Sequence, residues 1–181
     1  MIIFFGPAGS GKSAQGRLLE SDCGWKWLSM GQLLRDSMDG ELDAIMGTGK
    51  LVPYQITNQL LDKALKGIGD ISKVVIDGYP RQIEQATWLD ENYHKDKNGL
   101  DLGIILDVPK EELLRRMEGR GRADDTPDAI DERLKIFQEL VKPAIEYISS
   151  CGIRITTIDG VGTKDEVHQR IVQELIKCNL M

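Results

Sequence analysis

The residues with the most specific chemical spacing lie near the N-terminus, in the segment Gly6-Pro-Ala-Gly-Ser-Gly-Lys12-Ser13. The segment fits the pattern G-x-x-x-x-G-K-[S/T], in which glycines let the backbone curl so that successive N–H groups point inward at a polyphosphate. The lysine of such a loop reaches the terminal phosphates, and the hydroxyl beside it approaches a magnesium ion. An apolar run, Ile2 to Phe5, precedes the motif and a helical pattern follows it. This context favours a nucleotide-binding loop over an ordinary glycine-rich turn, but it leaves the acceptor of any transferred group open.

A carboxylate follows a second apolar run, because Asp77 comes directly after Lys73 to Ile76. An aspartate at the end of a buried strand is suited to hold Mg²⁺ through water, since this ion keeps several waters and takes few protein ligands. The same residue type is also a common helix cap. The phosphate loop favours the metal role, so Ser13 and Asp77 are the predicted magnesium residues.

Arginines are concentrated in one short segment of an acidic chain. Arg115, Arg116, Arg120 and Arg122 fall within eight residues, although 23 basic against 29 acidic residues give a net charge of −6. The acidic balance argues against non-specific binding to nucleic acid or to an anionic membrane. The cluster by itself fits a solvated helix face as well as a phosphate clamp.

Short, unbroken apolar runs alternate with stretches of helical spacing, which predicts an α/β fold with a parallel sheet flanked by helices. The continuous runs are typical of strands buried on both faces. Strands are expected over Ile2–Phe5, Lys26–Leu28, Lys73–Ile76, Gly103–Val108 and Ile153–Ile158. Helices are expected over Lys12–Ser21, Ile56–Lys66, Ile83–Tyr93, Lys110–Glu118, Asp128–Ser149 and Lys164–Cys178.

The chain of 181 residues suits a single domain with small inserts. Its core is predicted over 1–28, 62–118 and 128–181, a helical insert over 29–61 and a short loop over 119–127. No apolar run approaches the length of a membrane helix. Three cysteines without CxxC spacing predict neither a disulfide framework nor a zinc site, which favours a location inside the cell.

Five segments, in this order along the chain, resemble those of the nucleoside monophosphate kinases, and of the short-lid adenylate kinases in particular. GPAGSGKSAQ resembles the phosphate loop, LSMGQLLR the acceptor segment, GKLVP the stretch beneath the acceptor base, DGYPRQIEQA the catalytic turn, and GRGRADDTP followed by Arg133 the lid. The resemblance implies a P-loop NTPase-type three-layer fold with a five-stranded parallel sheet. It also implies reversible, Mg²⁺-assisted transfer of the terminal phosphoryl group of ATP to AMP by a cytoplasmic monomer, giving two ADP and serving adenine nucleotide homeostasis.

The resemblance also assigns roles to individual residues. Catalysis falls to Lys12, Arg81, Arg120, Arg122 and Arg133. ATP binding falls to Gly9, Ser10, Gly11, Lys12, Ser13, Ala14, Arg116, Arg120 and Gly162. AMP binding falls to Met30, Arg35, Lys50, Leu51, Val52, Gly78, Tyr79, Arg81, Gln85, Arg122 and Arg133. In addition, Asp124 and Asp125 are expected to cap the helix after the lid or to tether its arginines.

Three departures from the family pattern affect the expected substrate. Met30 stands where adenylate kinases usually carry threonine, Ser13-Ala14 replaces Gly-Thr, and the insert is short. Gln85 favours AMP, because relatives that act on UMP or CMP typically carry asparagine there. A UMP/CMP kinase therefore remains the main alternative, followed by a small-metabolite P-loop kinase and by a non-catalytic nucleotide-binding module. The short lid has no four-cysteine metal module, so zinc is not expected.

Overall fold

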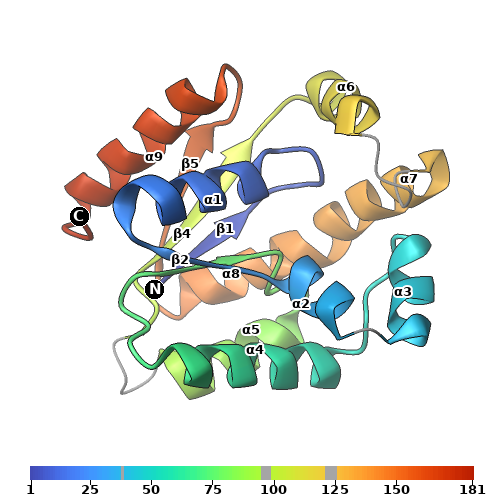
Figure 1. The fold of residues 1–181 in the computed structure, drawn as a ribbon, viewed down its shortest axis with the longest axis horizontal. Coiled ribbons are helices and arrows are strands. Elements are labelled where there is room, and N and C mark those ends of the chain that lie inside the picture. Colours follow the sequence, from blue (N-terminus) through green and yellow to red (C-terminus); the bar gives the residue numbers. More distant parts are fainter. Residues whose placement is uncertain (38, 95–98, 121–125) are drawn as a thin grey trace.

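A computed structural model describes residues 1–37, 39–94, 99–120 and 126–181, with the side chain of Arg120 excluded. Its centre is a five-stranded parallel sheet in the order β2-β3-β1-β4-β5 (Figure 1). The strands are β1 (Ile2–Phe5), β2 (Lys26–Ser29), β3 (Val74–Asp77), β4 (Leu102–Asp107) and β5 (Arg154–Asp159). The α/β class and the parallel five-stranded sheet agree with the sequence prediction.

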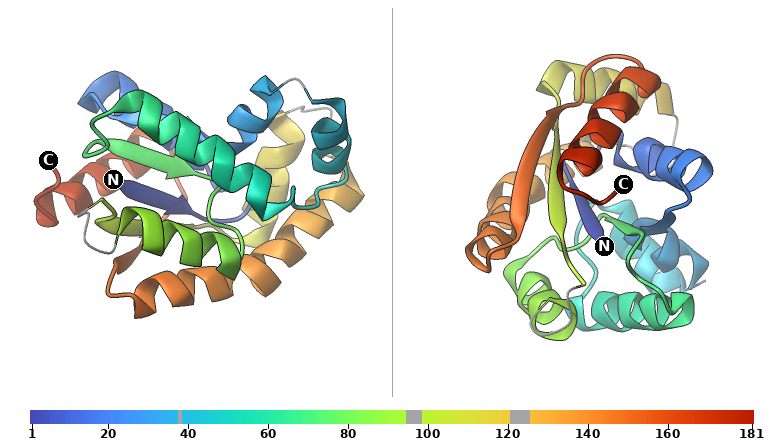
Figure 2. Two further views of the ribbon diagram at one scale, coloured as in Figure 1. Left: turned by 90° about the horizontal axis from the view of Figure 1, so that it is seen from below. Right: turned by 90° about the vertical axis from the view of Figure 1, so that its left-hand side faces the viewer.

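Helices cover both faces of the sheet. They are α1 (Lys12–Cys23), α2 (Met30–Asp36), α3 (Gly40–Gly47), α4 (Tyr54–Ile68), α5 (Ile83–Tyr93), α6 (Lys110–Arg120), α7 (Pro127–Ile136), α8 (Lys142–Ser150) and α9 (Lys164–Lys177). Figure 2 shows α1 and α9 on one side of the sheet and α5 and α8 on the other. No helix in the described part of the chain is long and apolar enough to cross a membrane.

The central strand β1 divides the core into two layers. Its residues alternate, so that Ile3 and Phe5 join the core beneath α4, α5 and α8, whereas Ile2 and Phe4 join the core beneath α1 and α9. All four are at most 2% exposed. The prediction of strands buried on both faces is confirmed for β1 and β3, and nearly so for β4.

The same prediction is wrong for the strand at residues 153–158. In β5, Arg154 and Thr157 are exposed. The reason is its position, because β5 is an edge strand that pairs only with β4. The sequence of an edge strand with one partly uncovered face can resemble that of a central strand. Its apolar residues still pack on the covered side.

The single helix predicted over Asp128–Ser149 is interrupted. A π-helical turn, η1 (Phe137–Val141), separates α7 from α8, and the backbone N–H of Lys142 bonds to the carbonyl of Phe137. Pro143 explains the interruption, because proline has no N–H to donate and its ring would clash with the carbonyl of Glu139.

Parallel pairing brings the carboxyl ends of the strands to one edge of the sheet. The register places Phe4 beside Asp77 and Ser29 also beside Asp77, while Phe5 pairs with Ile105. The phosphate loop, the start of α2 and the turn after β3 therefore lie next to one another. Open parallel sheets bind their ligands at this edge.

Close packing of α1 on β2 generates a stability prediction. A Cβ atom added at the buried Gly16 would lie 2.2 Å from Cδ1 of Trp27, whereas one added at the exposed Gly67 of α4 would meet no heavy atom within 4 Å. We expect Gly16→Ala to lower the free energy of unfolding by about 1–3 kcal/mol through overpacking. Gly67→Ala, the matched control, should raise it by about 0.5–1 kcal/mol. Urea unfolding followed by circular dichroism measures both, and equal stability of the two variants would contradict the predicted packing.

Candidate functional site

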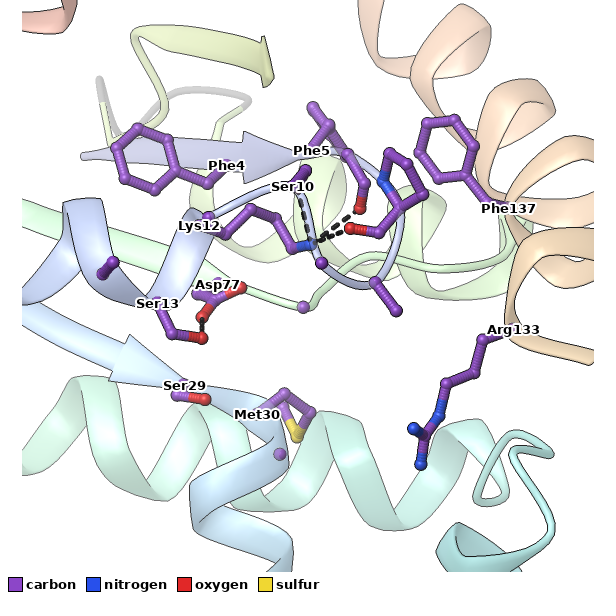
Figure 3. A pocket seen from close by; sticks show the side chains of 18 of the residues that line it. Phe4, Phe5, Ser10, Lys12, Ser13, Ser29, Met30, Asp77, Arg133 and Phe137 are labelled. Atoms are coloured by element: carbon purple, nitrogen blue, oxygen red, sulfur yellow. Dashed lines mark hydrogen bonds between the residues drawn. The ribbon is translucent and has the colours of Figure 1, made fainter. Parts of the chain in front are cut away.

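A cavity of about 800 Å³ opens at the carboxyl edge of the sheet. Figure 3 shows Lys12 and Ser13 on one side of it and Arg133 projecting towards it from another. The predicted site residues whose side chains are described all line this cavity: Gly9, Ser10, Gly11, Lys12, Ser13, Ala14, Met30, Arg35, Lys50, Leu51, Val52, Asp77, Gly78, Tyr79, Arg81, Gln85, Arg116, Arg133 and Gly162. Arg122 and the side chain of Arg120 lie outside the described residues.

The phosphate loop curls around the ammonium group of its own lysine. Lys12 Nζ donates hydrogen bonds to the carbonyl oxygens of Gly6 at 2.7 Å and Pro7 at 2.9 Å. Gly9 and Gly11 have φ angles of 84° and 99°, which side-chain-bearing residues rarely adopt. The helix α1 begins at Lys12, so its N-terminal N–H groups face the same space. This arrangement suits a polyphosphate.

Ser13 and Asp77 meet at the floor of the cavity. Ser13 Oγ donates a 2.6 Å hydrogen bond to Oδ2 of Asp77, whose residue is only 4% exposed (Figure 3). Asp77 does not cap the next helix, because α5 follows Gln82. A hydroxyl and a carboxylate are the oxygen ligands that Mg²⁺ prefers. The described residues contain no group of three or more His, Cys, Asp or Glu side chains placed to hold a metal. The pair therefore fits an ion that takes most of its ligands from water and phosphate.

Arg81 folds back onto the turn that carries it. Its Nε donates to the carbonyl of Gly78 at 2.9 Å, and its backbone N–H donates to Oε1 of Gln85 at 2.6 Å. Burial lowers the pKa of Arg81, nearby Asp77 partly offsets the shift, and the positive charge of Arg133 adds to it. A guanidinium titrates so far above neutrality that it stays charged. Two cations, Arg81 and Arg133, therefore act electrostatically on each other at this cavity, and an anion bound there would relieve their repulsion.

Arg133 links α7 to the helical segment on the far side of the cavity. Its Nη2 donates to the carbonyl of Met46 in α3 at 3.3 Å. The backbone is close here too, since a Cβ added at Gly49 would lie 2.6 Å from the carbonyl oxygen of Ala129. Arg133 therefore lies at the border of the cavity and contacts the segment that carries Met46.

Arg116 is held by an acidic partner on its own helix, α6. Arg116 Nε donates to Glu112 at 2.6 Å, and its Nη2 donates to the carbonyl of Gly160 at 3.0 Å. Arg115 binds the same carboxylate at 2.7 Å. Arg116 is thus fixed at the cavity, whereas Arg115, whose side chain is 73% exposed, pairs with Glu112 on a solvated face of α6.

Comparisons with known proteins identify the family. The family model for adenylate kinase matches residues 4–153. The chain belongs to the adenylate kinase family. Adenylate kinases from Mycobacterium ulcerans and Mycobacterium tuberculosis H37Rv are each 36% identical to it, over 97% of this chain and 99% of theirs. That of Mycolicibacterium vanbaalenii is also 36% identical, over 96% and 98%. Membership in this family makes the chain an enzyme of nucleoside monophosphate phosphoryl transfer.

The adenylate kinase cavity contains polar residues that the sequence analysis missed. Thr57 is 3% exposed and bonds to Gln85, and Glu112 and Gly160 at the border of the cavity hold Arg116. Behind the lining, Asn58 bonds to Tyr79. For Thr57 a signal existed. It lies about one helical turn before Leu61 and two before Leu65, so its hydroxyl falls on the buried face of α4.

The helix after the lid begins differently from the prediction. Thr126 is the N-cap of α7, and its side chain accepts a 3.3 Å hydrogen bond from the N–H of Ala129. Asp124 and Asp125, which were expected to cap it, lie outside the described residues. The reason is local, because Pro127 starts the helix and threonine directly before such a proline caps it well.

The arginine pair at Glu112 generates a prediction on ionisation. Hydrogen bonds from Arg115 and Arg116 lower the pKa of Glu112 from 4.5 to about 2. The pKa of Glu112 is lower in the folded than in the unfolded protein. The stabilisation of the fold by this pair is therefore complete above the ordinary pKa of 4.5 and is lost as pH falls through about 2. Side-chain NMR titration of the folded protein should show Glu112 still ionised at about pH 3.5, and Arg115→Ala or Arg116→Ala should raise its midpoint. A wild-type midpoint at the ordinary value would contradict the pairing.

Proposed function

We propose that this adenylate kinase family member transfers the terminal phosphoryl group of ATP reversibly to AMP, giving two ADP and serving adenine nucleotide homeostasis. One observation carries the proposal: a single cavity joins the phosphate loop to Arg35, Arg81, Arg116 and Arg133, which come from four different segments. Two phosphorylated substrates must meet for direct transfer, and both bring negative charge. Cations converging from several directions are what such a reaction requires.

At the donor end, the loop from Gly9 to Ala14 binds the phosphates of ATP through backbone N–H groups, with Lys12 at the terminal phosphates. Arg116 lies against the donor base, and Gly162 borders the same end of the cavity. Ser13 and Asp77 would hold Mg²⁺, in part through water, and an ion held there would supply charge neutralisation at the phosphate oxygens. Arg120 contacts ATP in this proposal.

At the acceptor end, Arg35 and Arg81 hold the phosphate of AMP, because a guanidinium offers a planar pair of donors to phosphate oxygens. The base lies among Met30, Lys50, Leu51, Val52, Gly78, Tyr79 and Gln85, all of which border the cavity. Arg122 and Arg133 bridge the two substrates.

Catalysis then rests on positioning and electrostatics rather than on covalent chemistry by side chains. The insert over 29–61 and the short lid over 119–127 close on the substrates and exclude water, which competes as an acceptor. The boundary proposed at residue 61 falls within α4. This helix therefore spans both the proposed insert and the proposed core.

The enzyme acts in the cytoplasm as a monomer in this proposal. Its three cysteines, all in the described part of the chain, are free, as is usual in the reducing cytoplasm.

One residue leaves a second acceptor class open. Met30 is 4% exposed at the border of the cavity and has no hydroxyl to offer a base, in contrast to the threonine usual in adenylate kinases. A UMP/CMP kinase is therefore the alternative function.

A coupled assay offering ATP with AMP, dAMP, GMP, CMP and UMP in parallel separates the two functions. We expect ADP to form fastest with AMP, and a preference for CMP or UMP would overturn that choice.

Removal of the two best-positioned cations should reduce turnover without unfolding the protein. Lys12→Ala and Arg81→Ala each remove a charge that stabilises the transferring group, so we expect kcat to fall about 100-fold or more. Matched controls are Lys66→Ala and Arg154→Ala, whose side chains are 73% and 59% exposed and lie outside the cavity. Initial rates with ATP and AMP measure the effect, while circular dichroism checks the fold. Wild-type rates in a folded Lys12→Ala or Arg81→Ala protein would refute these roles.

A further inference from the structure

The side-chain amide of Gln85 is held in a single orientation by groups whose hydrogen-bonding roles are unambiguous. The backbone N–H of Arg81 can only donate, so the atom 2.6 Å from it must be the oxygen of the amide, Oε1. The nitrogen, Nε2, therefore lies at the other end, 2.8 Å from Oγ1 of Thr57.

Thr57 fixes the same orientation independently. Its hydroxyl donates its one hydrogen to the carbonyl of Tyr54 at 3.0 Å, and a carbonyl can only accept. Only a lone pair of Oγ1 remains for Gln85, so the amide must present its NH₂ group there. A flipped amide would set donor against donor at Arg81 and acceptor against acceptor at Thr57. Both Gln85 and Thr57 are 3% exposed, so water cannot easily compensate for such contacts.

Hydrogen bonds of Tyr79 also connect α4, which carries Thr57, to α5, which carries Gln85. The hydroxyl of Tyr79 lies 2.8 Å from Oδ1 of Asn58 and 3.1 Å from the carbonyl of Gln85. Burial raises the pKa of Tyr79, so this hydroxyl remains a donor. Residues 57 and 58 of α4 thus both bind the segment that carries Gln85.

The fixed amide presents a defined pattern to the cavity. Nε2 carries two hydrogens and gives one to Thr57, which leaves the second for the cavity that Gln85 lines. Oε1 retains a second lone pair beside it. The facing edge of a base must then offer an acceptor to the N–H and a donor to the oxygen.

We propose that Thr57 is a positioning residue that orients Gln85 so that the acceptor site selects amino-bases over oxo-bases. Adenine and cytosine carry an unprotonated ring nitrogen beside an amino group, which complements the amide. Hypoxanthine and uracil carry a ring N–H beside a carbonyl, which opposes it at both atoms. The inference rests on the proposed role of Gln85 at the base, but it does not depend on whether purines or pyrimidines are preferred.

Two pairs of acceptors of equal ring size test the wild-type enzyme without any substitution. With ATP saturating, kcat/KM should be higher for AMP than for IMP and higher for CMP than for UMP, each by about tenfold or more. Equal values within both pairs, or a preference for the oxo-bases, would overturn the inference. If AMP were not the best acceptor, the proposed function would be overturned instead. The comparison of CMP with UMP would then still test whether Gln85 is oriented as inferred.

Substitution at Thr57 separates positioning from a merely structural role. Thr57→Val keeps the shape but removes the hydroxyl, so the ratio of kcat/KM for AMP over IMP should fall about fivefold, mainly through KM for AMP. Thr57→Ser retains the hydroxyl and should restore the wild-type ratio. Calorimetric binding of AMP and IMP to both variants gives a readout free of turnover. The positioning role would be rejected if Thr57→Val lowered kcat/KM equally for AMP, IMP, CMP and UMP. It would also be rejected if the ratio of kcat/KM for AMP over IMP stayed unchanged.

Discussion

The site depends on the parallel pairing of β1 with β3. This register sets Phe4 beside Asp77, and the loop after β1 then returns Ser13 to within 2.6 Å of the Asp77 carboxylate. A shift by one residue would move every side chain of β1 to the opposite face, exchanging Ile2 and Phe4 with Ile3 and Phe5 between two filled cores. Packing on both faces therefore fixes the alignment of the phosphate loop and its acidic partner.

Backbone carbonyls orient the cations around the cavity. Lys12 rests on Gly6 and Pro7, Arg81 on Gly78, Arg133 on Met46 and Arg116 on Gly160. A carbonyl oxygen carries only a partial charge, so each of these contacts orients a cation while itself neutralising little of the charge. The arrangement prepares positive charge in advance of the phosphates, so less reorganisation is needed when they bind. Glu112 also binds Arg116.

The alternation of apolar runs with helical spacing was enough to predict the fold class, the strands and most helices. The same alternation did not predict features that depend on which strands and helices are neighbours in the folded protein. The exposed residues of β5 follow from its place at the edge of the sheet, and strand order is not written in a local pattern. The break between α7 and α8 did have a local cause, Pro143, but the rest of the helical periodicity outweighed it.

By itself, the sequence determined the phosphate loop, the acidic residue after β3 and the family resemblance, because each depends on residue types at short, fixed spacings. Only the tertiary structure decided how Gln85 is oriented, since its partners Arg81 and Thr57 lie on different segments and Tyr54 in turn fixes the hydrogen of Thr57. It alone also placed Arg133 against Met46, 87 residues away in the chain. Hydrogen-bond direction in a buried network is set by all its members together, so it emerges only when folding brings them within reach.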